Sequence, residues 1–230
     1  DAVEKISADV MRWMYATQNP ASNMRFGYNV ARETHSTLLT LWNCYAFFET
    51  YNDKSKVRSQ KAKVKTKSLG ILEQWIISRF NGLIKTATEA LDNYEPQKAT
   101  QAIESFWIND LSLWYIRRSR KRFQEAQNTL YYILINLSKL TAPMCPFFSE
   151  AVYGKLRQDK DPESVHLCAW PVYDDGLINE ELEKDMAQIR ALVSVGLAER
   201  ARVGLAVRQP LQKLKVRVAK DENSYSDNRA

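Results

Sequence analysis

Glycine and proline are scarce in this sequence, with seven of each among 230 residues. Folds built from many short strands need frequent turns, so this scarcity argues against an all-β protein and favours long helices. No stretch approaches the roughly 20 consecutive apolar residues that a membrane-spanning helix needs. The N-terminal residues DAVEKISADV do not resemble a signal peptide either. We therefore expect a helical protein with no membrane partner.

Cysteine is also rare, and catalytic and cofactor motifs are missing. Cys44, Cys145 and Cys168 are odd in number, far apart and surrounded by apolar residues, which fits neither a disulfide framework nor a CxxC zinc pair. His35 and His166 stand alone, and the sequence has no GxGxxG, GxxxxGK or HExxH motif and no assignable Ser-His-Asp set. The sequence thus predicts a reducing, cytoplasmic setting, with no metal site, no cofactor and no catalysis by these residues.

The composition suits a folded, basic domain. Apolar residues make up 45% and charged residues 26% of the chain, as in ordinary globular proteins. The formal net charge is +6, which favours an acidic partner without identifying it. Apolar residues recur at three- and four-residue steps in several long stretches, the pattern of a helix with a buried face. These stretches predict helices over residues 6–18, 28–51, 69–93, 96–123, 125–140 and 179–204.

We therefore expect an all-α bundle of about five major helices, with a minor extended part near the C-terminus. Residues 164–171 read as mainly extended. After Pro210, the alternation of Leu214, Val216 and Val218 with lysine and arginine predicts a strand with a cationic outer face. The domain limits that follow are a connector over residues 1–26, a helical bundle over 27–178, and a C-terminal helix, strand and loose tail over 179–230.

The stretch from Phe106 to Phe123, FWINDLSLWYIRRSRKRF, joins an aromatic, apolar half to a half with five cations in six residues. No acidic residue lies between Ser112 and Gln124 to neutralise them locally. Arginine forms paired hydrogen bonds with phosphate, and arginine, tryptophan and tyrosine stack on unpaired bases. The stretch therefore indicates a nucleic-acid partner. The simpler alternative is a solvated helix face, with cations placed by the helix dipole.

Two other features have structural explanations. Asp110 falls on the inward stripe of the same helix, so its carboxylate needs a partner, either Arg117 two turns along that face or a group on a neighbouring helix. Because no second acid or base accompanies it, we interpret Asp110 as a hydrogen-bonding residue between helices rather than a catalytic one. Residues 52–68 hold seven cations and one acid, and we expect a solvated connector there.

Seven segments carry a family pattern: SADVMRWMY (7–15), LLTLWNCYAFFETY (38–51), WIISRFNGLI (75–84), ALDNYEPQKATQAIESFWINDLSLWYIRRSRKRF (90–123), LTAPMCPFFSEAVYGKLR (140–157), SVHLCAWP (164–171) and RVGLAVRQPL (202–211). Together they resemble the C-terminal part of isoleucyl-tRNA synthetases. The resemblance covers nearly the whole chain except the lysine-rich connector and the polar tail. WYIRRSR and RVGLAVRQPL look like the isoleucine enzyme rather than its valine, leucine or methionine relatives.

The resemblance implies that the chain is the tRNA-recognition piece of an enzyme that joins isoleucine to its tRNA at the cost of ATP. In that family a helical bundle following the catalytic domain binds the anticodon stem and loop. The family's HIGH and KMSKS motifs and its editing domain are absent here. We therefore expect a monomeric piece that begins just beyond the catalytic domain and is inactive alone. ATP, magnesium and the zinc of some members would belong to other parts of such a ligase.

The residues expected to contact tRNA lie in the cationic half of the Phe106–Phe123 stretch, with a second group before the predicted strand. Trp114 has the core as its alternative position, and Arg117 has Asp110 as an alternative partner. The alternative function is a helical interaction module whose cations meet an acidic protein or a membrane surface. The absence of internal repeats counts against it. The candidate tRNA-binding residues are Trp114, Tyr115, Arg117, Arg118, Arg120, Lys121, Arg122, Arg208 and Gln209.

Overall fold

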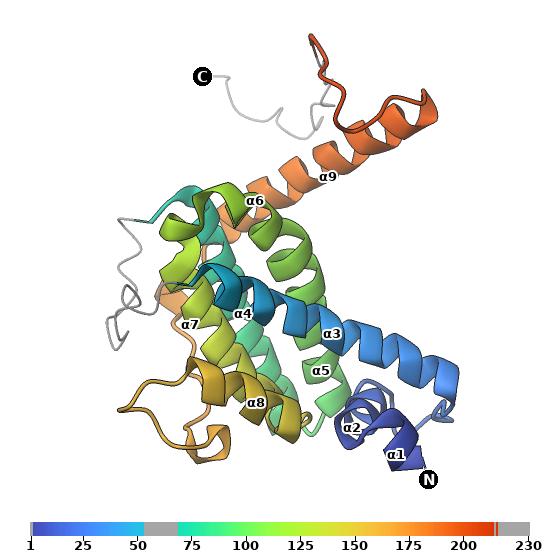
Figure 1. Cartoon of the computed structure of the whole chain (residues 1–230), viewed down its shortest axis with the longest axis vertical. Coiled ribbons are helices and arrows are strands. Elements are labelled where there is room, and N and C mark those ends of the chain that lie inside the picture. Colours follow the sequence, from blue (N-terminus) through green and yellow to red (C-terminus); the bar gives the residue numbers. More distant parts are fainter. Residues whose placement is uncertain (1, 53–68, 214, 216–230) are drawn as a thin grey trace, which may run out of the picture. The chain divides into compact units, whose positions relative to one another are not determined.

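A computed structural model describes residues 2–52, 69–213 and 215 of the chain (Figure 1). Within these ranges all regular structure is helical and no strand is present. The chain divides into two units, Asp1–Asp185 and Met186–Ala230, and each is described by itself. No helix of the described ranges is long and apolar enough to cross a bilayer. The prediction of an all-α fold is confirmed.

Two short helices, α1 (Ala2–Ile6) and α2 (Ala8–Ala16), precede the long helix α3 (Tyr28–Tyr51) and pack against it. Figure 1 shows them beside the N-terminal end of α3. The single helix predicted over residues 6–18 is interrupted at Ser7, whose φ of 76° lies in the left-handed region. The Ser7 side chain accepts a hydrogen bond from the first turn of α2 and so caps that helix.

The long helix α4 (Ile71–Asp92) is central to the bundle. It packs against α5 (Pro96–Ser105), the helical stretch η2 (Phe106–Ile116) and α7 (Phe123–Thr141). Figure 1 shows α4, α5 and α7 running side by side. The central part of its apolar stripe is buried, as the three- and four-residue spacing predicts, whereas Leu72 and Leu91 at its ends are half-buried. The buried residues of this stripe include Trp75, Ile76, Phe80, Ile84 and Ala87.

Helix α2 also holds the turn between α7 and α8 (Pro146–Leu156). The Arg12 guanidinium donates to the backbone carbonyls of Pro143 and Met144, at 2.8 and 3.1 Å. Asp9 Oδ2 accepts a hydrogen bond from the Phe148 amide at 2.5 Å and thereby caps the N-terminus of α8. Two side chains of one short helix thus satisfy the polar backbone groups of a distant turn.

The stretch from Pro96 to Phe123 is helical throughout, but it is not one α-helix. After α5, η2 is a π-helix, followed by a single α-helical turn, α6 (Arg117–Ser119), and a 3-10 turn, η3 (Arg120–Arg122). A π-helix bonds residues five apart instead of four, so its side chains fall out of the α-helical register. Leu113 lies three residues from Asp110 and would share its inward face in an α-helix, but it is 45% exposed, whereas Leu111 is fully buried.

Beyond α8 come two 3-10 turns, η4 (Val165–Leu167) and η5 (Asp175–Leu177), and the long helix α9 (Glu180–Arg202). The extended segment predicted over residues 164–171 is wrong at its centre, which is the turn η4. The Glu150 carboxylate accepts from Ser164 Oγ and from the Val165 amide, both at 2.9 Å, and this local bonding favours a turn.

The remaining helix predictions are confirmed to within a few residues, including the last one, which corresponds to α9. Two predictions concern residues that lie outside the described ranges. Residues 53–68 of the predicted connector lie outside the described residues, and so do Leu214, Val216 and Val218 of the predicted strand.

Candidate nucleic-acid interface

Four of the predicted cations lie together on the surface of the first unit, on α6 and η3. Arg117, Arg118, Arg120 and Lys121 are exposed, whereas Ser119 between them is fully buried. We call these four exposed residues the cationic turn. The buried serine and the helical segments on either side place this turn against the bundle. Their contact with RNA stays a prediction.

Arg122, the fifth predicted cation, is directed into the protein instead. Its Nη2 and Nη1 donate to the two carboxylate oxygens of Glu73 at 2.6 and 3.1 Å, and Nη1 also donates to Glu125 at 3.3 Å. The hydrogen bonds with Glu73 raise the pKa of Arg122 above its usual value. The Glu73 side chain is 3% exposed and that of Glu125 is 72% exposed, so Glu73 is the partner that needs a counterion. Arg122 is therefore engaged with carboxylates and only partly exposed, and its contact with RNA stays a prediction.

The two aromatic candidates lie in the core. Tyr115 is fully buried, and its hydroxyl donates to Glu73 Oε1 at 3.1 Å. Burial, and then the charge of Glu73, raises the pKa of Tyr115 well above its usual value. Trp114 is 8% exposed, and the guanidinium carbon of Arg118 lies 3.1 Å from the centre of its ring. Trp114 thus takes its alternative position in the core, and Tyr115 is buried beside it, because the apolar half of the helix supplies the core.

Asp110 is buried, as predicted, but its partner is not Arg117. Its Oδ2 accepts from Arg79 Nε at 3.0 Å, and Arg79 Nη1 donates to Glu183 at 3.0 Å. Burial alone would lower the pKa of Arg79, but the charge of Asp110 and the hydrogen bond to Glu183 outweigh it and raise the pKa. Asp110 is thus a helix-to-helix residue, while Arg117 remains exposed at the surface.

Arg208 and Gln209 belong to the second unit and are exposed there. The Arg200 guanidinium donates to the carbonyl of Gln209 at 2.6 Å and to that of Ala206, and these bonds hold the chain after α9 in a compact loop. Gly204, with a φ of 71°, lets the backbone turn at the end of the helix. The part of Arg208 and Gln209 in tRNA binding stays a prediction.

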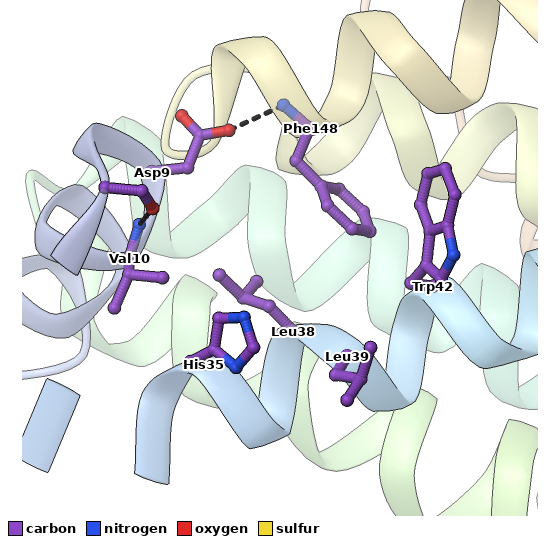
Figure 2. A pocket seen from close by; sticks show the side chains of 8 residues that line it. Asp9, Val10, His35, Leu38, Leu39, Trp42 and Phe148 are labelled. Atoms are coloured by element: carbon purple, nitrogen blue, oxygen red, sulfur yellow. Dashed lines mark hydrogen bonds between the residues drawn. The ribbon is translucent and has the colours of Figure 1, made fainter. Parts of the chain in front are cut away.

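A cavity of about 360 Å³ opens between α2, α3 and α8. Figure 2 shows Leu38, Leu39, Trp42 and Phe148 around it, with the Asp9 carboxylate bonded to the backbone of Phe148. This carboxylate caps a helix. The lining also includes Ser7 and His35 and is otherwise apolar. In the part of the chain that the structure describes, no group of three or more histidine, cysteine or acidic residues could hold a metal ion.

Glu73 and Arg79 were missed by the sequence analysis, although both organise the site. A signal was available for Glu73, which is a charged residue within the apolar stripe of α4, whereas Arg79 lies at an exposed position of that helix. A charge at such a position needs a partner on another element. The identity of that partner could not be read from the sequence, because the partners are 49 and 31 residues away.

The family of anticodon-binding domains of tRNA ligases matches residues 73–216, which is more than half of the chain. The chain therefore belongs to this family. Its sequence is similar to isoleucine–tRNA ligases. It is 39% identical to that of Dehalococcoides mccartyi, over 94% of this chain and 23% of the relative. It is 36% identical to that of Thermus thermophilus, over 94% of this chain and 22% of the relative. The chain thus spans less than a quarter of the length of these curated relatives.

Among solved structures, LeuRS from Agrobacterium radiobacter, in a ternary complex with tRNA and LeuAMS, has a similar fold. The TM-score is 0.58, over 77% of this chain and 21% of that chain, at 17% sequence identity. At this level of identity the likeness concerns the fold alone. It agrees with the helical bundle that the sequence predicts.

Proposed function

We propose that this chain binds the anticodon stem and loop of an isoleucine tRNA, as the tRNA-recognition part of an isoleucine–tRNA ligase. The cationic turn is the observation that carries the proposal. Its four cations are exposed on one short segment, while the nearby acids point to other groups: Asp110 to Arg79, and Glu73 and Glu125 to Arg122. A locally positive surface is what a folded RNA loop requires.

The chemistry of the turn fits a bent single strand flanked by phosphates. Three of its four residues are arginines, whose planar guanidinium groups pair with phosphate and stack on exposed bases. Phosphate contacts set the position of the RNA, and base contacts distinguish one loop from another. Membership of the anticodon-binding family and similarity to isoleucine–tRNA ligases support the choice of tRNA over other polyanions.

The rest of the proposed ligase would supply the chemistry. We expect activation of isoleucine with ATP and magnesium, and any zinc site, outside this chain, since its sequence carries neither the HIGH nor the KMSKS motif. We propose that this chain acts in the cytoplasm as part of a monomeric enzyme. Its own contribution is to hold the tRNA, so it is not expected to exchange pyrophosphate into ATP in the presence of isoleucine.

Binding of fluorescent isoleucine and valine tRNAs, followed by anisotropy at about 50 and 200 mM salt, tests the proposal. We expect roughly micromolar affinity for the isoleucine tRNA and a steep loss as salt is added. Replacing Arg117, Arg118 and Arg120 by glutamate should weaken binding at least about 100-fold while the circular dichroism spectrum stays helical.

A matched control reverses the charge of three exposed cations on α8 and directly after it. These are Lys155, Arg157 and Lys160. Figure 1 shows α8 well separated from α6. Equal losses in the two triple variants would mean that net charge, and not the cationic turn, governs binding. Tight binding to acidic lipid vesicles without preference for tRNA would instead support the alternative of a general interaction module.

A further inference from the structure

Glu73 joins three elements through one buried carboxylate. It lies in the first turn of α4, accepts the Tyr115 hydroxyl from η2 at 3.1 Å, and accepts both Nη atoms of Arg122 from η3 at 2.6 and 3.1 Å. The Glu73 side chain is 3% exposed, so these bonds replace water. A carboxylate in this position requires its partners, because leaving it unpaired in the interior is costly.

The N-terminus of α4 is built to admit this carboxylate. Gly70 precedes the helix, and a Cβ atom added there would lie 2.7 Å from Glu73 Oε2, closer than packed atoms approach. The absence of a side chain at Gly70 therefore leaves room for the Glu73 carboxylate beside the first turn of α4. The positive end of the helix dipole also favours a negative charge in this turn.

Arg122 contacts Glu73 from the segment Phe106–Arg122, whose backbone is not a continuous α-helix. The chain passes from a π-helix to one α-helical turn and then to a 3-10 turn between Phe106 and Arg122. Such short, non-α turns have poorer hydrogen-bond geometry than an α-helix, so their conformation depends on tertiary contacts. Arg122 is the last residue of the 3-10 turn, and Arg120 and Lys121 are the residues directly before it.

We propose that Glu73 is the positioning residue of the cationic turn: by binding Arg122 with both carboxylate oxygens and Tyr115 with one, it fixes the 3-10 turn that presents Arg120 and Lys121 to RNA. Arg122 then contributes to RNA binding by holding the 3-10 turn in place and not by contacting phosphate. This inference rests on the proposed function, because it concerns how the same surface is held.

The proposal predicts the opposite sign from simple electrostatics. Replacing Glu73 by glutamine removes a negative charge close to a positive surface, which by itself strengthens binding to a polyanion. If the carboxylate positions the turn, the same replacement releases Arg122 and weakens RNA binding. Glu125→Gln removes an equal charge from the exposed partner of Arg122 and serves as the matched control.

The experiment measures the affinity of the full chain for the isoleucine anticodon stem-loop at several salt concentrations. For Glu73→Gln we expect binding about three- to tenfold weaker and a salt slope lower by about one phosphate contact, roughly 0.7. Glu125→Gln should bind as the wild type or slightly tighter. A variant that is merely less stable lowers the folded fraction and leaves the salt slope unchanged. Wild-type or tighter binding by Glu73→Gln overturns the proposal.

Arg122→Lys decides the question if Glu73→Gln does not fold. Lysine keeps the positive charge but cannot form the two parallel bonds. We expect it to weaken RNA binding at least about threefold. Wild-type affinity and salt slope in Arg122→Lys would show that a positive charge at this position is sufficient, and the positioning role would be wrong.

Hydrogen exchange separates failure of this inference from failure of the proposed function. The amides of residues 118–123 should exchange faster in Glu73→Gln than in Glu125→Gln, whether or not RNA binds. Faster exchange together with a wild-type chain that binds no RNA would overturn the RNA-binding function and leave the structural clamp in place. Unchanged exchange with intact RNA binding would overturn only the positioning role.

Discussion

The guanidinium carbon of Arg118 lies 3.1 Å from the centre of the Trp114 ring, and Arg118 Nη1 donates to the carbonyl of Trp114 at 3.2 Å. A cation over an indole ring is attracted by the negative face of the ring. The side chain is thus held in one orientation although it is exposed. Since less side-chain freedom is lost on binding, a pre-oriented arginine gains affinity at a lower entropic cost.

Arg118→Lys tests the value of this arrangement for RNA binding. Lysine keeps the charge but loses the planar group that stacks on both an indole and a base. We expect RNA binding about three- to tenfold weaker with an unchanged salt slope, measured by anisotropy. Arg157→Lys, an exposed arginine outside the cationic turn, is the control and should bind within about twofold of the wild type. Equal effects of the two changes would show that only charge matters at position 118.

Arg79→Ala tests the helix-to-helix pair with Asp110. Asp110 has a side chain that is 7% exposed, and it would lose the guanidinium that lies 3.0 Å away. We expect a loss of about 1–3 kcal/mol in the free energy of unfolding, measured in urea, with the partial exposure of Arg79 limiting the cost. Lys85→Ala breaks a solvent-exposed pair with Asp175 and should leave the urea midpoint unchanged. A similar midpoint in both variants would contradict a structural role for Asp110.

Alkylation should distinguish the three cysteines. Burial raises the pKa of Cys44 from 9.0 to about 12 and also raises that of Cys145, whereas Cys168 is only half-buried. Thiolates are the reactive form, so iodoacetamide near neutral pH should modify Cys168 first and the other two only in urea. Mass spectrometry of the native and denatured chain measures this order. Rapid modification of Cys44 in the native chain would contradict its burial.

The same burial predicts a decrease in stability at high pH. A thiol with a raised pKa in the folded state keeps its proton more tightly when folded than when unfolded. Its contribution is therefore fully present below the unfolded pKa of 9.0 and is lost as pH rises toward the folded pKa of about 12. Urea unfolding at several alkaline pH values measures this loss in the wild type and in Cys44→Ala. The free energy of unfolding should fall less steeply with pH in the variant.

Trp13→Ala should be among the most destabilising single changes. The Trp13 ring is fully buried, lies 4.8 Å from that of Trp107, and its Nε1 donates to Glu104 at 2.7 Å. We expect a loss of about 3–5 kcal/mol in the free energy of unfolding, by urea or thermal denaturation. Tyr15→Ala, on the same helix but 37% exposed, should cost much less. Comparable losses of stability in the two variants would indicate that Trp13 is not the main contact between α2 and the core.

The sequence determined the helices, because their spacing and boundaries are local properties. The apolar stripe of α4 and the proline that begins α5 were sufficient to place the start of these elements within a few residues. The cationic run and its lack of neighbouring acids were also visible, and four of its five cations are exposed. Those features require no knowledge of which residues meet in space.

Only the tertiary structure decided which of the aromatic and cationic residues face outward. The π-helical register of η2 shifts side chains from the faces that an α-helix predicts, and it is held by packing against α3, α4 and α5. Arg122 is directed inward because Glu73, 49 residues away, presents a buried carboxylate that needs a counterion. A charge pair between distant segments depends on where the chain folds back, and periodicity along one helix carries no information about that.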